Sequence, residues 1–243
     1  MEGYEPPTYG DRIADVYDEW YAELDPANAV ELLAELAGDG RVLELAIGSG
    51  RIALPLAARG VEVHGIDASE RMVERLRAKP GGEEIPVTMG DFAEVPVEGT
   101  FRVVFVAFNT FFALPDQESQ LRCFERVAAH LDDDGVFVLE AFVPDLSRFD
   151  RGQRVSSPRS KLDHVVLDVS QLDAATQTVF SQHILISDEG TRLHPVRVRY
   201  AWPTELDLMA RLAGLRLRAR YADWNRTAFS SEAASHVSVY ERG

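Results

Sequence analysis

Residues 42–60, VLELAIGSGRIALPLAARG, join an apolar run, two glycines one residue apart and a segment of helical character. The run predicts a buried strand, and the segment after it predicts a helix from about residue 51 to residue 59. Glycines at such a turn, Gly48 and Gly50, let a ligand approach the backbone at the start of the helix. The stretch therefore predicts a strand, turn and helix that bind a nucleotide-like ligand.

An acid inside the predicted strand narrows the choice of ligand. In dinucleotide enzymes this turn reads G-x-G-x-x-G or G-x-G-x-x-A, which Gly48, Gly50 and Ala53 satisfy, and Asp67 lies where a ribose-binding acid would be. Glu44 would repel a pyrophosphate, but it would not repel a cation or an amino-acid zwitterion. A buried carboxylate costs free energy unless it has a partner, and backbone or an arginine remains the alternative partner.

Predicted strands and helices alternate along much of the chain. The strands are expected at 41–47, 61–67, 85–91, 101–109 and 135–143, and the helices between them at 51–59, 69–79 and 116–131. An amphipathic helix over 12–25 and a second one over 29–37 precede them. Such alternation indicates a parallel sheet covered on both faces, joined by right-handed crossovers.

The pattern changes after Pro144. Residues 163–173, 176–187 and 191–202 alternate with period two, and polar turns separate them, which predicts an antiparallel meander. Residues 147–161 read as a linker before it. A helix over 204–215 and strands over 216–224 and 236–242 complete the chain.

The composition excludes several classes of protein. The 243 residues carry a formal charge of −15, which argues against nucleic acid as a partner, because phosphate binding depends on Lys and Arg. One cysteine, Cys123, excludes an internal disulfide and a cysteine-rich metal site. The acids Asp132–Asp134 read as a turn, and no metal is expected. The first residues lack the features of a secretory signal and no window is long enough to span a membrane, so we expect a cytoplasmic protein with no membrane partner.

In their order and spacing, these motifs resemble the class I S-adenosylmethionine-dependent methyltransferases, and the resemblance covers nearly the whole chain. VLELAIGSG matches the first motif of that family, an acid in strand one followed by G-x-G. Asp67 matches the acid that accepts hydrogen bonds from the ribose hydroxyls, and GDF at residues 90–92 matches the segment that meets adenine. The fold this implies is α/β: a doubly wound, Rossmann-like, seven-stranded, mostly parallel sheet with its last strand antiparallel, plus a three-stranded antiparallel insertion after strand five.

The resemblance implies S-adenosyl-L-methionine as cofactor and S-adenosyl-L-homocysteine as product. Three of the residues have alternative roles. Arg51 would bind the methionine carboxylate or face solvent. Asp67 would also suit the N-cap of a helix, and Phe92 would suit the hydrophobic core. The cofactor residues that it implies are Glu44, Ala46, Gly48, Gly50, Arg51, Asp67, Ala68, Met72, Gly90, Asp91, Phe92 and Phe108.

The acceptor is expected beyond the C-terminal ends of the parallel strands. The insertion is similar to the lid sheet of amino-sugar N,N-dimethyltransferases and glycine N-methyltransferase, which covers a small acceptor and sometimes builds a homodimer. His164, His183 and His194 lie on it. An amine can lose its proton to solvent, whereas a hydroxyl needs a positioned base, so the catalytic residue stays open among Tyr17, Asn109, His183 and His194. The expected acceptor residues are Tyr9, Tyr17, Trp20, Tyr21, Asn109, Phe112, Glu140, Phe142, Trp224 and Arg226.

The sequence thus predicts a helical cap over 1–38, a cofactor-binding core over 39–146, a lid over 147–202 and a return to the core over 203–243. The predicted activity is N- or O-methylation of a small specialised metabolite by in-line transfer, with catalysis mainly by positioning. The alternatives are an NAD(P)-dependent oxidoreductase and a non-catalytic S-adenosylmethionine-binding protein.

Overall fold

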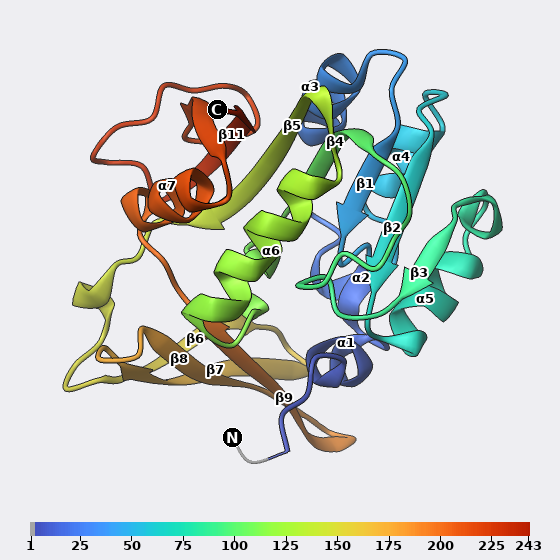
Figure 1. Ribbon diagram of the computed structural model, residues 1–243. Helices are drawn as coiled ribbons and strands as arrows, with labels where there is room; N and C mark the ends of the chain where they lie inside the picture. The colour runs from blue at the N-terminus through green and yellow to red at the C-terminus, as the bar shows by residue number, and fades with distance from the viewer. Residues whose placement is uncertain (1–2) are drawn as a thin grey trace.

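The computed structural model describes residues 3–243, which form two β-sheets and the helices around them (Figure 1). The larger sheet has the strand order β10-β11-β5-β4-β1-β2-β3, and only β11 runs against its neighbours within the described residues. The predicted seven-stranded, mostly parallel sheet with an antiparallel last strand is confirmed. Its strands are β1 (Val42–Leu45), β2 (Val63–Asp67), β3 (Val87–Met89), β4 (Phe101–Val106), β5 (Leu131–Phe142), β10 (Leu215–Tyr221) and β11 (Ser235–Arg242).

Helices cover both faces of this sheet, as a doubly wound fold requires. The alternation of β4 shows it directly: Val104 and Val106 join one buried cluster, and Val103 and Phe105 join the other. The first cluster packs against α6 (Gln117–Ala129) and α7 (Pro203–Leu212), and the second packs against α3 (Ala27–Ala37), α4 (Ala53–Ala57) and α5 (Glu70–Arg77). Short 3₁₀ helices lie at η1 (Gly82–Glu84), η2 (Thr110–Ala113) and η3 (Leu146–Arg148).

The strand order reverses at β1, which lies between β2 and β4. The chain leaves the C-terminal ends of β1 and β4 in opposite directions, and such a switch point opens a crevice at that edge of a sheet. In Figure 1 the arrow of β1 points toward the smaller sheet, which lies across this edge. The topology therefore puts the turn of residues 46–50 under the smaller sheet.

The smaller sheet has four antiparallel strands rather than the three predicted. They are β6 (Gln153–Ser160), β7 (His164–Asp173), β8 (Thr178–Ser187) and β9 (Gly190–Arg199). Strand β6 has no strand signal in its sequence because it is polar and contains Pro158, so residues 147–161 read as a linker. Proline is tolerated at a sheet edge, and β6 is an edge strand whose register shifts between Ser156 and Arg159.

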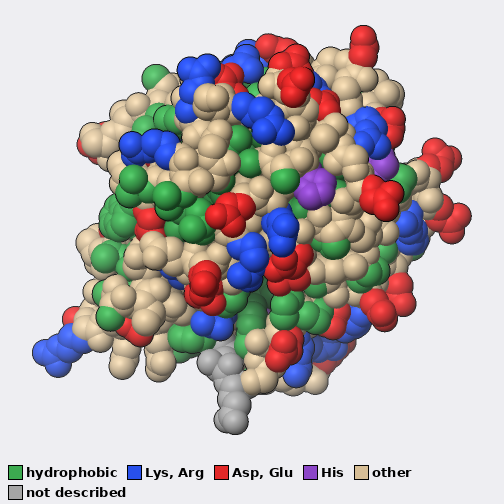
Figure 2. Space-filling model, viewed as in Figure 1, with side chains coloured by type: hydrophobic (Ala, Val, Ile, Leu, Met, Phe, Trp, Pro, Cys, Tyr) green, Lys and Arg blue, Asp and Glu red, His purple; other side chains and the backbone are tan. Residues whose placement is uncertain are grey.

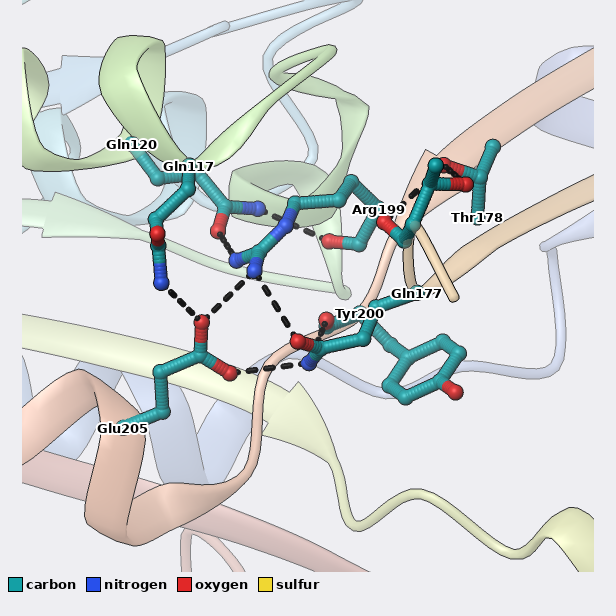
Figure 3. A network of polar contacts seen from close by, with 8 residues as sticks. Gln117, Gln120, Gln177, Thr178, Arg199, Tyr200 and Glu205 are labelled. Carbon is teal, nitrogen blue, oxygen red and sulfur yellow. Dashed lines mark hydrogen bonds and ion pairs between the residues drawn. The ribbon is translucent and has the colours of Figure 1, made fainter. Parts of the chain in front are cut away.

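A buried arginine joins the smaller sheet to the helices of the larger one. Arg199, only 5% exposed, donates to Gln120 of α6 at 2.6 Å, to Glu205 of α7 at 2.6 Å and to Gln177 before β8 at 3.2 Å (Figure 3). Glu205 also accepts from Gln117 and Gln177, each at 2.8 Å. The network therefore ties the C-terminal end of β9 to α6 and α7 of the larger sheet.

The N-terminal segment departs from the single helix predicted over 12–25. Two short helices form instead, α1 (Thr8–Ile13) and α2 (Tyr17–Trp20). Tyr17 of α2 packs against Tyr21, and Trp20 packs against His194 of β9. The break between α1 and α2 lies at residues 14–16, before both of these side chains.

Another boundary differs from prediction at the start of β5. The strand begins at Leu131, so the acids of residues 132–134 lie inside it and not in a turn. Arg102 pairs with Asp134, and the hydroxyl of Thr100 donates to Asp132, at the edge of the sheet away from the crevice. Within residues 3–243, no helix is long and apolar enough to cross a membrane.

Candidate active site

Two adjoining cavities lie at the C-terminal ends of β1, β2 and β4. The main cavity has a volume of about 160 Å³, and the side cavity has a volume of about 30 Å³. Tyr17, Ala46, Gly48 and Thr110 line both, so the two cavities meet there. The main cavity is also lined by Tyr4, Glu5, Pro6, Tyr9, Gly10, Asp67, Ala68, Ser69, Met72, Asp91, Phe92, Ala113, Leu114, Pro115 and Arg197, and the side cavity by Glu44, Ile47, Ser49, Arg51, Ile52, Ala107 and Phe108.

The two glycines of the turn have different surroundings. Gly48, with φ +58°, lines both cavities, and Ala46 before it is also left-handed at φ +56°. Gly50, with φ +80°, lines neither, and a Cβ there would lie 2.4 Å from Cδ1 of Leu76 and 3.0 Å from Cγ of Leu54. Gly50 therefore lets α4 and α5 pack closely at the turn.

Two opposite charges lie unsatisfied in the side cavity. Glu44 is 6% exposed, its Oε2 has no hydrogen-bond partner, and burial raises the pKa of its carboxyl well above the usual range, an effect that Arg51 opposes. The Nε of Arg51 is also buried without a partner, and its guanidinium lies 5.0 Å from the centre of the Phe108 ring. An α-amino and α-carboxylate pair would satisfy both groups, and this fits the amino-acid end of S-adenosylmethionine.

Asp67 ends β2 and ties the turn to the next helix. Its two oxygens accept from the backbone N–H of Gly48 at 2.7 Å and of Ser69 at 2.8 Å. Burial raises the pKa of the Asp67 carboxyl, and these N–H groups oppose the rise. The N-cap of α5 is Ser69, which accepts from Met72. A carboxylate has about four acceptor positions, so Asp67 keeps capacity for hydroxyl donors in the main cavity.

Two residues of the segment at 90–92, Asp91 and Phe92, line the main cavity. Asp91 accepts from the backbone N–H of Ala93 at 2.9 Å, and Phe92 lies half-buried against the core. Gly90 lines neither cavity, and its N–H donates to the backbone carbonyl of Asp67. Asp91 and Phe92 thus offer the main cavity an acceptor and an apolar surface.

The N-terminal segment brings aromatic side chains to the cavities: Tyr9 lines the main cavity and Tyr17 lines both, whereas Trp20 and Tyr21, also expected at the acceptor, line neither. The hydroxyls of Tyr9 and Tyr21 lie 3.2 Å apart, and the ring of Tyr21 contacts that of Phe108 with centres 4.8 Å apart. Burial raises the pKa of Tyr17 to about 12. Tyr17 is therefore a hydrogen-bond donor near neutral pH.

Polar contacts hold this segment in place. Asp18 of α2 accepts from Ser49 at 2.6 Å and from Nζ of Lys79 at 2.9 Å, and Asp11 of α1 accepts from the hydroxyl of Ser69 at 2.6 Å. Each contact joins the segment to the turn after β1 or to α5. The cover over the cavities therefore depends on several ionic contacts.

Several residues expected at the acceptor line neither cavity. Asn109 accepts from the N–H of Phe142 at 2.7 Å, and Glu140 accepts from the N–H of Phe108 at 2.6 Å, so both brace the ends of β4 and β5. Phe112 is fully buried in the core, where it contacts Phe142.

Trp224 and Arg226 lie elsewhere on this edge. They line a shallow cavity with Asn28 of α3, and Arg226 pairs there with Glu35. No residue of this cavity lines the main or the side cavity. The structure therefore separates these two residues from Tyr9 and Tyr17, which do line the main cavity.

The histidines of the smaller sheet have different surroundings. His194 lies against Trp20, and Nδ1 of His183 lies 3.8 Å from Asp168. His164 begins β7 and contacts Asp163 at 2.9 Å. Among residues 3–243, no three His, Cys, Asp or Glu side chains gather as a metal site would require.

Some residues that line the main cavity had no signal in the sequence. Tyr4, Leu114 and Pro115 lie in loops, Thr110 lies in η2 and Arg197 lies on β9, far from the glycine motif along the chain. The hydroxyl of Tyr4 accepts from the N–H of Arg197 at 3.4 Å, which brings the N-terminus against the smaller sheet. Only the folded chain brings these residues together.

Known proteins resemble this chain over its full length. A family model described as a methyltransferase domain matches residues 42–135. The structure of the CcbJ methyltransferase from Streptomyces caelestis is 42% identical with a TM-score of 0.94, and the match covers 99% of this chain and 100% of that one. The cypemycin N-terminal methyltransferase of a Streptomyces species is 28% identical over 249 residues, covering 98% of this chain and 99% of its own.

A further structure shares the fold. CalS10 from Micromonospora echinaspora, an amino pentose methyltransferase solved with S-adenosylmethionine bound, is 20% identical with a TM-score of 0.70, and the match covers 94% of this chain and 97% of that one. The unsatisfied Glu44 and Arg51 of the side cavity also fit that cofactor. The chain belongs to the class I S-adenosylmethionine-dependent methyltransferases.

Proposed function

We propose that this enzyme methylates an amino nitrogen of a small natural product or of a short peptide end. The observation that carries the proposal is the position of the smaller sheet, which contacts α1 and η2 beside the two cavities. A sheet in that place works as a lid over an acceptor that fits beneath it. The name of one relative supports the nitrogen, because that relative acts on an N-terminus.

We assign the cofactor residues from the two cavities. Glu44 would hold the α-amino group and Arg51 the α-carboxylate in the side cavity. Asp67 would accept from the ribose hydroxyls, and Asp91 and Phe92 would meet adenine in the main cavity. This arrangement leaves the junction of the cavities, at Tyr17, for the reacting centre.

The side chains of the protein then contribute to the reaction mainly by positioning the acceptor. When bound, S-adenosylmethionine supplies a methyl group activated by sulfonium, so the protein must orient the acceptor in line and exclude water. Phe108 places apolar ring surface in the side cavity, and the ring of Tyr21 contacts it there from outside the lining. Because burial raises the pKa of Tyr17 to about 12, its hydroxyl would orient a group and not take a proton.

Charge and shape both argue against a nucleic-acid acceptor. The net charge is −15, and Figure 2 shows Asp and Glu side chains interspersed with Lys and Arg over the face in view. A duplex would also meet the smaller sheet before it reached the cavities. A small molecule or a flexible peptide end would not.

We also propose that two copies of the chain form a homodimer through the smaller sheet. Its outer strand β6 exposes Val155, and β9 exposes Leu193. Exposed strand edges and apolar side chains favour pairing between copies. Light scattering after size exclusion tests the dimer, and a monomer at all concentrations would contradict it.

The test of the activity uses cofactor labelled on the methyl group. The enzyme is incubated with extracts of its native host and with a panel of amino sugars, peptides with free N-termini, phenols and carboxylic acids, and products are identified by mass spectrometry. We expect label on nitrogen in an amino sugar or at a peptide N-terminus. Label only on oxygen would contradict the proposed nitrogen acceptor. Binding of S-adenosylhomocysteine with no labelled product anywhere would indicate a non-catalytic binding protein.

A further inference from the structure

A groove with a volume of about 520 Å³ lies beside the main cavity, between the start of α6, the turn from β7 to β8, and β9. Pro115 and Arg197 line both the groove and the main cavity, so the two spaces meet there. Part of the groove wall is the polar network of Figure 3, since Gln117, Gln177 and Arg199 also line it. The groove is therefore a second space, with a wall held by buried polar contacts, that opens into the proposed site.

Four arginines line this groove and the three cavities described above. Arg199 and Arg226 each pair with a glutamate. Arg51 lies in the side cavity, where we assign it to the carboxylate of the cofactor. Arg197 alone of the four has neither assignment, because among residues 3–243 no carboxylate lies within 4.0 Å of its guanidinium. In a chain with 40 acidic and 25 basic residues, an arginine left free in a cavity indicates a site for an anion.

The guanidinium of Arg197 has a donor that a ligand can reach. Nη2 donates to the backbone carbonyl of Pro115 at 3.3 Å, and the guanidinium lies 5.6 Å from the centre of the Phe180 ring, which helps to hold it in place. Nε is buried without a partner, whereas Nη1 has no partner within residues 3–243 and is not buried. Since a guanidinium has five N–H donors, Nη1 remains able to donate to an anion.

Tyr4 adds a second donor beside Arg197. Its hydroxyl accepts from the backbone N–H of Arg197 at 3.4 Å, and the hydroxyl hydrogen has no acceptor of its own within residues 3–243. Burial raises the pKa of Tyr4, and the backbone N–H and the charge of Arg197 oppose the rise, so Tyr4 keeps its proton near neutral pH. Both residues line the main cavity. A carboxylate has two oxygens and can accept from both donors.

Two acids of the groove limit the kind of anion that fits. Asp116 accepts from the N–H of Ser119 at 2.7 Å, and Asp173 accepts from the N–H of Ala175 at 3.0 Å and from the hydroxyl of Thr176 at 2.9 Å. These hydrogen bonds lower the pKa of both carboxyls, so both are charged near neutral pH. They repel a doubly charged phosphate more strongly than a singly charged carboxylate. The groove therefore favours a ligand with one carboxylate and an uncharged remainder.

We propose that Arg197 and Tyr4 bind a carboxylate of the acceptor where the main cavity meets the groove, and that the part of the acceptor beyond it lies in the groove. Tyr17, at the junction assigned to the reacting centre, lines the same main cavity as Arg197. One molecule can thus present its nitrogen at the junction and its carboxylate at Arg197. This inference rests on the proposed function for the nitrogen, and it narrows the acceptor to an amine that also carries a carboxylate.

The binding test uses small probes and enzyme loaded with S-adenosylhomocysteine, so that the cofactor already occupies the site of Arg51. The probes are para-fluorobenzoate, para-fluorobenzamide and para-fluorophenyl phosphate, and fluorine NMR follows their titration. Wild-type protein should bind the benzoate about tenfold more tightly than the neutral amide, because a charge-assisted hydrogen bond is stronger than a neutral one. Phosphate should bind more weakly than benzoate. Equal binding of benzoate and amide by wild type would overturn the proposal, and tighter binding of phosphate would overturn the choice of carboxylate.

Variants then locate the site. Arg197→Gln should remove the preference for benzoate over the amide, Arg197→Lys should keep part of it, and Tyr4→Phe should reduce it. Arg192→Gln is the matched control, because Arg192 is an exposed residue of the same strand that pairs with Glu189, and it should bind as wild type does. Calorimetry should show the same S-adenosylhomocysteine affinity in Arg197→Gln and wild type. A preference that persists in Arg197→Gln, or a loss of S-adenosylhomocysteine affinity there, would overturn the proposal.

The turnover test separates this site from the proposed nitrogen acceptor. For a methylated amine that carries a carboxylate, wild type should show a KM about tenfold lower than for the primary amide of the same compound, and in Arg197→Gln the two KM values should become equal. If amines without a carboxylate have the lower KM, the carboxylate site is wrong and nitrogen methylation stands. If label appears on oxygen alone, the nitrogen acceptor is wrong, and the benzoate titration still decides whether Arg197 binds a carboxylate.

Discussion

Replacing Glu44 by glutamine should change apo stability and cofactor affinity in opposite directions. In the wild-type protein Oε2 is buried without a partner, and the backbone N–H of Ala53 stabilises the carboxylate. The variant keeps an oxygen for that N–H and presents an amide NH₂ as the second group. The buried charge is then lost with little change in shape.

The stability effect follows from the raised pKa. A carboxyl whose pKa is higher in the folded state binds its proton more tightly there, so folding loses stability as pH rises from the unfolded pKa through the folded one. A buried unsatisfied group costs about 1–3 kcal/mol, and more when charged. At about pH 8, where unfolded glutamate is ionised, the apo form of Glu44→Gln should therefore be more stable than wild type by about 1–3 kcal/mol. The gain should shrink in acid.

The affinity effect has the opposite sign. The α-amino group of the cofactor is a cation, and it loses a charge-assisted hydrogen bond worth about 1.5–3 kcal/mol. That is about a 10- to 150-fold rise in Kd for S-adenosylhomocysteine. Urea unfolding of the apo protein and calorimetric titration with S-adenosylhomocysteine measure the two effects. Glu62→Gln, an exposed acid near Arg41, is the control and should change neither.

Two results would refute this reasoning. Unchanged S-adenosylhomocysteine affinity in Glu44→Gln would remove the side cavity from the cofactor site. A variant less stable than wild type at about pH 8 would mean that the carboxylate is satisfied in the apo protein, contrary to its raised pKa.

Three further variants test other parts of the site. Asp67→Ala should weaken S-adenosylhomocysteine binding by about 1–3 kcal/mol in calorimetry and destabilise the apo protein, because two backbone N–H groups lose their acceptor. Lys79→Met should speed S-adenosylhomocysteine release about two- to fivefold in stopped flow, since its half-exposed ion pair with Asp18 holds the covering segment. The only other lysine gives the control, Lys161→Met. Glu205→Gln should cost about 3–5 kcal/mol in urea unfolding, because it leaves Arg199 buried without its carboxylate. A loss of unfolding free energy under about 1 kcal/mol would mean that this ion pair contributes no more than an exposed one does.

Several residues that the sequence places at the cofactor do line the two cavities, because local geometry determines where they lie. Glu44, Gly48 and Arg51 lie on one strand and one short turn, so a motif of ten residues is enough to bring them into one cavity. Gly50 was expected to serve the ligand and serves helix packing instead. A glycine pattern cannot distinguish these uses, since both need a missing side chain.

The sequence said less about surfaces that depend on tertiary contacts. Strand β6 is polar and carries Pro158, so nothing in its pattern marks it as a strand, and it pairs because β7 offers an edge. Arg197 reaches the main cavity because β9 packs on α1 and η2. The turn between Ile13 and Tyr17 likewise follows from contacts with α5 and the smaller sheet.

The polar residues at the ends of β4 and β5 were expected to bind the acceptor because of their side-chain chemistry, but they have another role. Phe108 and Asn109 are consecutive and both left-handed, with φ of +57° and +64°, and such backbone costs on the order of 1–3 kcal/mol per residue. Glu140 and Asn109 use their oxygens on backbone N–H groups that hold this loop in place. Their role is therefore to position the Phe108 ring over Arg51 and against Tyr21. Since these polar groups are occupied, the polar side chains that line the main cavity come from other elements, such as Tyr17 of α2 and Arg197 of β9.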